Sequence, residues 1–158
     1  MSSELRPGAA VERRFFDQEH RELELGIGRI EEVAGLAGSL AARDLSNALR
    51  TLLDWLQRSL RPHVEWEESW LYPEFDRIGG TPWVTRVMRC EHRQIERLIQ
   101  LLEGDWEELR HEPTHRQLVD LRARLYALHS LVRSHFEKEE RFLLPLLGNE
   151  VEATSHLD

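Results

Sequence analysis

Four histidines in this chain each precede a glutamate by four residues. The pairs are His20/Glu24, His63/Glu67, His92/Glu96 and His135/Glu139. On a helix, residues four apart share a face, so each pair would present an imidazole and a carboxylate in the same direction. Chance spacing among the eight histidines of the chain would give about one such pair. Imidazole and carboxylate together suit iron or manganese, and zinc also accepts them, so the pattern indicates a metal site.

The four pairs belong to two copies of one pattern. His92 follows His20 by 72 residues, and the same offset relates His135 to His63 without a gap. Two copies of a helical hairpin explain this offset, and they cover most of the chain.

Apolar residues recur at steps of three and four through four segments, so each segment is expected to form an amphipathic helix. The four seams run from Phe16 to Ala37, Leu49 to Trp70, Met88 to Leu109 and Leu121 to Phe142. Because short connections make neighbouring helices antiparallel, we predict an all-α, up-down-up-down four-helix bundle with an internal two-hairpin repeat. The bundle is expected over residues 11–148, with flexible termini at 1–10 and 149–158.

Three prolines bear on the second and fourth helices. Pro73 and Pro145 are expected to end them, because proline cannot continue a regular helix. Pro62 lies inside the second helix and is expected to kink it just before His63.

The four histidines occupy seam positions that the heptad normally gives to apolar residues, and Glu67 and Glu139 do the same. A lone buried histidine is more often satisfied by a carbonyl group than by a metal. Burying an unpaired carboxylate costs several kcal/mol, whereas a small domain has only about 5–15 kcal/mol of stability. Cations are therefore expected among these side chains, and eight donors around one axis suit two metal ions.

The motifs that carry these donors resemble those of the hemerythrin-like, or HHE cation-binding, family over about residues 17–148. They are Glu19-His20-Arg21, His63-x-x-x-Glu67-Glu68 ending in Tyr72-Pro73, Glu91-His92, and His135-x-x-x-Glu139-Glu140 ending in Leu144-Pro145. The resemblance implies a non-haem site of two iron ions with an oxo or hydroxo bridge. By the same resemblance, His20 and His63 would bind one iron, His92 and His135 the other, and Glu67 and Glu139 would bridge them.

The chain departs from the oxygen-carrying hemerythrins at two positions. Glu96 stands where they have a second histidine in the third helix, and Glu139 replaces a later aspartate. Glu96 is therefore expected to be a terminal ligand. Glu24 is its counterpart by repeat symmetry only, so a ligand and a solvated carboxylate are equal readings of it. Tyr72 adjoins the metal layer in sequence, and its role stays open.

These donors favour redox or detoxification chemistry with O2, H2O2 or NO, because carboxylate ligands stabilise ferric iron. Whether the protein is an enzyme stays open. The alternative is a non-catalytic O2- or iron-binding protein for storage, transport or sensing. A nearly closed set of ligands favours a small diatomic or peroxide ligand over an organic substrate.

The composition excludes several other classes of function. A net charge of −8 argues against nucleic acid and anionic membranes as partners. The single cysteine, Cys90, cannot form an intramolecular disulfide or a cysteine-based cluster, and it fits a reducing compartment. No apolar stretch approaches the roughly 18 residues of a membrane span, and the N-terminus lacks a signal-peptide core. We therefore expect a cytoplasmic protein that is a monomer or a weak homodimer.

Overall fold

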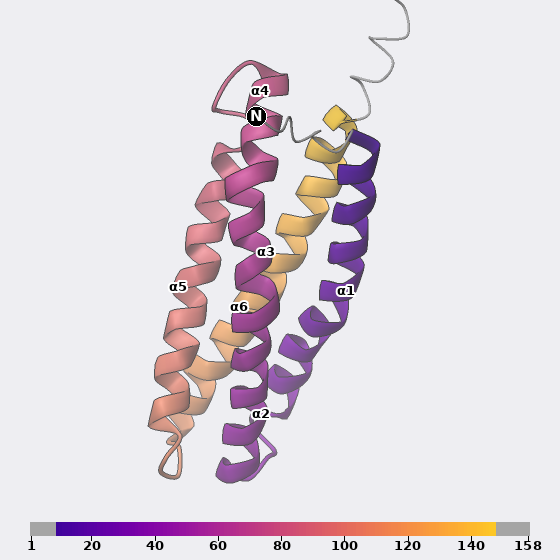
Figure 1. Cartoon of the computed structure of the whole chain (residues 1–158). Coiled ribbons are helices and arrows are strands. Elements are labelled where there is room, and N and C mark those ends of the chain that lie inside the picture. The colour runs from indigo at the N-terminus through magenta and orange to yellow at the C-terminus, as the bar shows by residue number, and fades with distance from the viewer. Residues whose placement is uncertain (1–8, 148–158) are drawn as a thin grey trace, which may run out of the picture.

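The structure, a computed structural model, describes residues 9–147, and these residues form only helices and the turns between them. The helices are arranged as columns that run side by side along one long axis (Figure 1). The columns are α1 (Ala9–Leu36), a second column that is continuous over residues 42–79, α5 (Arg86–Glu108), and α6 (His115–Lys138) with its extension to residue 147. The predicted all-helical bundle is confirmed. The predicted flexible termini lie outside the described residues, apart from the first two residues of α1.

The second column consists of α2 (Ala42–Trp55), α3 (Arg61–Trp66) and α4 (Tyr72–Gly79), which two π-helical turns join end to end. Each column packs against two others. The first column contacts α2 and α6, and α5 contacts the same two elements from the other side. The four columns therefore enclose one interior. Within the described part of the chain, no helix combines the length and the apolarity that a bilayer-spanning segment needs.

A polar layer divides the apolar interior into two clusters. The larger cluster includes Leu23, Leu60, Ile95 and Val132, and the smaller one includes Phe16, Leu71, Met88 and Leu143. In every column, a predicted donor histidine lies between a residue of one cluster and a residue of the other. Apolar side chains thus cover the polar layer on both sides along the bundle axis, which keeps bulk water away from it.

Three π-helical turns interrupt the second and fourth columns: η1 (Leu56–Leu60), η2 (Glu67–Leu71) and η3 (Glu139–Leu143). Each ends two residues before a proline. In all three, the residue just before the proline donates its N–H to the carbonyl five residues earlier rather than four. A wider turn relieves the clash that proline makes in a regular helix, where it also lacks an N–H to donate.

The predicted helix ends at Pro73 and Pro145 are therefore wrong. The second column continues through Pro62 and Pro73 to Gly79, where Gly80, with φ of 69°, ends it in the left-handed conformation. The fourth column continues through Pro145 to the last described residue. A π-helical turn before each proline lets the helix accommodate a residue that would otherwise stop it.

The turns η2 and η3 also shift which side chains face the core. One extra residue in a turn rotates the following side chains by about 100°. The heptad predicts that Trp70 and Phe142 continue the buried seams, and this prediction is wrong: they are 74% and 68% exposed. Their neighbours Leu71 and Leu143 take the buried positions instead.

This shift of register can be measured by stability. We expect Leu71→Ala to lower the free energy of unfolding by about 2–5 kcal/mol, because it leaves a cavity in the core. We expect Trp70→Ala to change it by only about 0.5 kcal/mol, because its side chain is exposed. Urea denaturation followed by circular dichroism measures both, and Leu143→Ala with Phe142→Ala repeats the comparison in the fourth column. A larger loss for Trp70→Ala than for Leu71→Ala would contradict the π-helical register.

Candidate metal centre

Six of the eight predicted donors meet in the polar layer, and all six are buried. Their nitrogen and oxygen atoms form two groups in which all donor atoms lie within 4.8 Å of one another. The first group consists of His20, His63, Glu67 and Glu139, and the second of Glu67, His92 and His135. Each column contributes one histidine, so the layer forms only when all four columns are in place.

Glu67 belongs to both groups. Its Oε1 lies 2.7 Å from His63 Nε2, and its Oε2 lies 2.9 Å from His92 Nε2. Glu139 also extends between histidines of the two groups, with its Oε1 3.1 Å from His135 Nε2 and 3.6 Å from His20 Nε2. The two carboxylates therefore link neighbouring groups, as bridging ligands between two cations would.

A second set of carboxylates, here called the outer carboxylates, surrounds the donor layer; these residues are Glu19, Glu68, Glu91 and Glu140. Each lies against the Nδ1 atom of a histidine on the next column. The four distances are 2.5 Å for Glu19–His63, 2.8 Å for Glu68–His92, 2.9 Å for Glu91–His135 and 3.2 Å for Glu140–His20. The contacts run in one direction around the bundle and return to the first column, so they form a closed ring.

The outer carboxylates determine which ring nitrogen carries the proton. A carboxylate only accepts hydrogen bonds, so the Nδ1 atom of each histidine must be the donor. In a neutral imidazole, Nε2 is then an acceptor that points into the layer. Four buried atoms there have no hydrogen-bond partner: Nε2 of His20, Nε2 of His63, Oε1 of Glu67 and Oε1 of Glu139. All four are acceptors or can be, which is the arrangement that bound cations would satisfy.

Without a metal, protons provide part of the positive charge that the layer needs. Burial lowers the pKa of His63, but the charge of Glu67 and the hydrogen bond to Glu19 outweigh it and raise the pKa to about 10. Burial likewise lowers the pKa of His135, but hydrogen bonds to Glu139 and Glu67 raise it to about 11.

The two bridging carboxylates respond in opposite directions. Burial raises the pKa of Glu67, but the charge of His63 and hydrogen bonds to the histidines hold it well below its usual value. Burial and the charge of Glu67 raise the pKa of Glu139 to about 8. Of the pair, Glu67 is thus the carboxylate that stays ionised, and Glu139 accepts a proton more readily.

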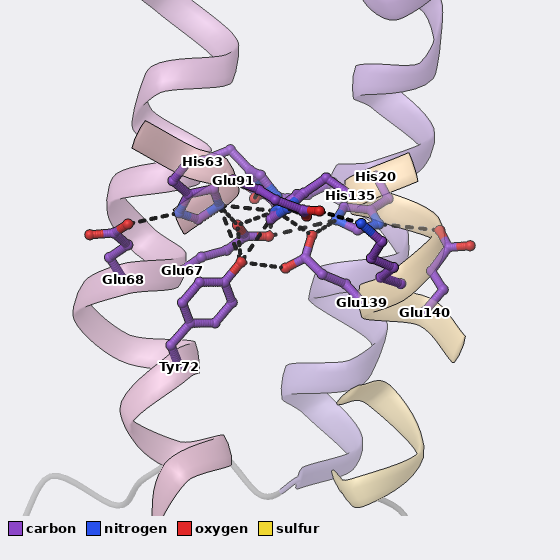
Figure 2. Close-up of polar contacts among 12 residues, drawn as sticks. His20, His63, Glu67, Glu68, Tyr72, Glu91, His135, Glu139 and Glu140 are labelled. Carbon is purple, nitrogen blue, oxygen red and sulfur yellow. Dashed lines mark hydrogen bonds and ion pairs between the residues drawn. The ribbon is translucent and has the colours of Figure 1, made fainter. Parts of the chain in front are cut away.

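Tyr72 enters the layer from the smaller apolar cluster, and its side chain is fully buried. Figure 2 shows its hydroxyl where several contacts of the layer converge, with Glu68 and Glu140 at the outer sides. The hydroxyl oxygen lies 3.0 Å from Glu139 Oε2 and 3.3 Å from Glu67 Oε2. Burial and these two negative charges raise the pKa of Tyr72 far above its usual value.

Glu24 and Glu96 do not join the donor layer. The Glu24 side chain is exposed on α1. The Glu96 carboxylate is 41% exposed and accepts two hydrogen bonds from the Arg61 guanidinium, at 2.7 and 3.0 Å. In α1 and α5 the buried position after the histidine comes three residues later, at Leu23 and Ile95, so the residue four positions on turns away from the layer.

The sequence does not by itself reveal that the four outer carboxylates form a ring around the histidines. Its available signal was the repetition of two doublets at the 72-residue offset: Glu19-His20 with Glu91-His92, and Glu67-Glu68 with Glu139-Glu140. It left Tyr72 open because the second copy has Leu144 at that position. Only the side-chain positions reveal that the tyrosine hydroxyl reaches the donors.

The family described as Hemerythrin HHE cation binding domain matches the chain over residues 12–147. The chain belongs to this hemerythrin HHE family. Comparisons with curated proteins and with solved structures gave no match. The family's cation-binding character agrees with the buried His/Glu groups, so the layer is a candidate metal centre of a hemerythrin-like domain.

The outer carboxylates can be tested through metal affinity. We expect Glu68→Gln to weaken metal retention about 10–100-fold, because the amide orients and polarises His92 less well than a carboxylate does. Competition with a chromophoric chelator measures the affinity. Glu65→Gln is the matched control, since Glu65 lies on the same helical run but is exposed. Equal affinities of the two variants would remove the proposed role of the outer ring.

The raised imidazole pKa values predict proton release on metal binding. Near neutral pH, below both pKa values, His63 and His135 hold protons that a metal ion must displace. Adding Zn²⁺ to weakly buffered protein should therefore release about one proton from each, which a pH indicator dye measures. The release should diminish as the starting pH is raised through about 10. Stoichiometric binding with no change in pH would contradict these protonation states.

Proposed function

We propose that this chain is a non-haem di-iron protein of the hemerythrin-like type whose centre reacts with O2, H2O2 or NO in redox or detoxification chemistry. In this proposal His20 and His63 hold one iron, and His92 and His135 hold the other. The observation that carries it is the sharing of Glu67 by both donor groups, which would allow two ions to lie side by side.

The residues of the layer fit such a pair of ions. The donor atoms are imidazole nitrogens and carboxylate oxygens, and the four without hydrogen-bond partners lie in the interior of the layer. This donor chemistry suits iron or manganese, and zinc also accepts it. An oxo or hydroxo bridge is part of the proposal, because two ions beside one bridging carboxylate commonly share a small oxygen ligand.

Iron, when bound, would supply one-electron redox chemistry and Lewis acidity. The chain's own residues would control access to it. A cleft of about 470 Å³ between the second column and α5 is lined by Glu68 and His92, and a cleft of about 250 Å³ beside α1 is lined by Glu19 and His63. Of the six buried donors, each cleft is lined by a single histidine, and this limited access favours O2, H2O2 or NO over an organic substrate.

The source of negative charge around the centre differs from the sequence expectation. Two ferric ions with an oxide, Glu67 and Glu139 would keep a net positive charge, since Glu24 and Glu96 lie outside the layer. The outer carboxylates offset this charge through the imidazoles they contact, and they make those imidazoles stronger donors. Stronger donors favour the ferric state, which supports an irreversible redox reaction over reversible oxygen carriage.

We further propose the up-down-up-down order and the two-hairpin repeat. Two observations support them. The helices α1 and α5 pass from the smaller apolar cluster to the larger, whereas the other two columns pass in the opposite order. The turns η2 and η3 begin 72 residues apart, at Glu67 and Glu139.

A cytoplasmic location is proposed, together with a monomer or weak homodimer that binds neither nucleic acid nor membranes. The net charge of −8 and the free Cys90 support this part of the proposal.

The decisive experiment combines metal analysis with optical spectra of the purified protein before and after peroxide. We expect two irons per chain, an oxo-bridge absorption band, and consumption of peroxide that continues over repeated additions. Glu67→Gln should abolish iron binding, while Glu24→Gln should retain two irons because its side chain is exposed.

Two results would contradict the proposal. If iron stays bound in Glu67→Gln, Glu67 is not the bridging ligand on which the proposal rests. Repeated cycles of oxygenation and evacuation that restore the diferrous spectrum unchanged would favour the alternative of a non-catalytic oxygen-binding protein.

A further inference from the structure

The two donor groups of the layer are unequal. The first contains four side chains, whereas the second, made of Glu67, His92 and His135, contains three. The Tyr72 hydroxyl lies beside the second group, 3.1 Å from His92 Nε2 and 3.2 Å from His135 Nε2. The hydroxyl also contacts Glu67 and Glu139, so it has four buried neighbours, and each of them would be a ligand of the proposed ions.

Hydrogen bonding does not satisfy this arrangement once the imidazoles are neutral, as metal binding requires. The Nδ1 atoms of His92 and His135 carry protons toward their outer carboxylates, so in the neutral rings both Nε2 atoms are acceptors. The ionised Glu67 and Glu139 oxygens are acceptors as well, and the Tyr72 hydroxyl has one hydrogen for these four acceptors. Without a metal, protons on the imidazoles and carboxylates occupy this space, and once they are displaced a cation is what the electron pairs could share.

The spacing of these atoms matches neighbouring ligands of one ion. Ligands at right angles around an octahedral ion, each about 2.1 Å from it, are about 3.0 Å apart. The distances of the Tyr72 oxygen to its four neighbours are 3.0–3.3 Å. The Nε2 atoms of His92 and His135 are 3.0 Å apart, and His92 Nε2 is 2.9 Å from Glu67 Oε2. The tyrosine oxygen thus lies at a distance from the second group that a further ligand of the same ion would have.

In the metal-free layer, burial and the charges of Glu67 and Glu139 keep the proton on Tyr72, whereas a guanidinium over its ring acts in the opposite sense. The Arg89 guanidinium lies over the ring at 5.3 Å from its centroid, and the His92 ring stacks on it at 5.2 Å and 15°. A positive charge above the ring stabilises a phenolate more than a phenol. The position that corresponds to Tyr72 in the second copy is Leu144, which has no ligand atom, so only one of the two groups has a tyrosine oxygen beside it.

We propose that Tyr72 is a ligand of the ion held by His92 and His135, and that it coordinates this ion through its phenolate oxygen. The inference rests on the proposed di-iron centre and makes that centre asymmetric. On binding, the hydroxyl proton leaves to solvent and the phenolate oxygen takes its place beside the ion, so one negative charge is added to the layer.

Resonance Raman spectroscopy of the ferric protein tests the proposal. Coordinated tyrosinate gives a charge-transfer band in visible light, and excitation in this band enhances vibrations of the tyrosine ring. We expect both signals in the wild type, with ring vibrations that shift when the protein is grown with ring-deuterated tyrosine. The chain has two tyrosines, so Tyr126→Phe is the matched control and should keep the signals. Tyr72→Phe should lose them while still binding iron.

The outcomes separate this inference from the function on which it rests. Wild-type protein with two irons per chain and no tyrosinate vibrations would overturn the role of Tyr72 and leave the di-iron proposal standing. Protein that binds no iron would overturn both. If Tyr72→Phe does not fold, the deuterated Tyr126→Phe variant decides, because its only tyrosine is Tyr72: retained vibrations support the assignment, and their loss overturns it.

Discussion

The structure depends on the convergence of hydrogen-bond acceptors in an apolar interior. Imidazole nitrogens and carboxylate oxygens face one another in a layer that two hydrophobic clusters cover, and four of these atoms have no hydrogen-bond partner. Such an arrangement is unfavourable unless positive charge lies among the donors, whether as protons or as metal ions. This need for positive charge explains why the pKa values of His63 and His135 are raised. It also explains why Glu67 can belong to both donor groups. Packing in the two apolar clusters holds the polar side chains together although their convergence is unfavourable.

The outer carboxylates connect this layer to the protein surface. Glu19, Glu68 and Glu140 are partly exposed and Glu91 is buried, and each contacts a buried imidazole. The four carboxylates therefore place negative charge beside the histidines from outside the donor layer. Glu91 differs from the others because it also accepts a hydrogen bond from Lys138, which offsets part of its charge. The imidazole of His135 therefore has a less negative partner than that of His92, and the two histidines of the second donor group are not electronically equal.

Much of the centre could be predicted from the sequence, because polar residues on an apolar seam have few physical explanations. The four histidines, Glu67 and Glu139 follow from that argument. Glu96 is expected from the resemblance and Glu24 from repeat symmetry, but in α1 and α5 the residue four positions after the histidine turns away from the layer. The π-helical turns could not be predicted, because a proline in sequence ordinarily signals the end of a helix. Tyr72 depends on such a turn, since η2 sets the rotation at which its side chain leaves the column.

The ring of outer contacts has a consequence for biosynthesis. His20 is near the beginning of the chain, and its partner Glu140 is emitted from the ribosome only after three of the columns have been completed. Glu139, which both donor groups approach, arrives at the same late stage. A nascent chain that stops before η3 thus has the four imidazoles but lacks Glu139 and Glu140. The complete donor layer therefore forms only in a chain that has been translated through its fourth column.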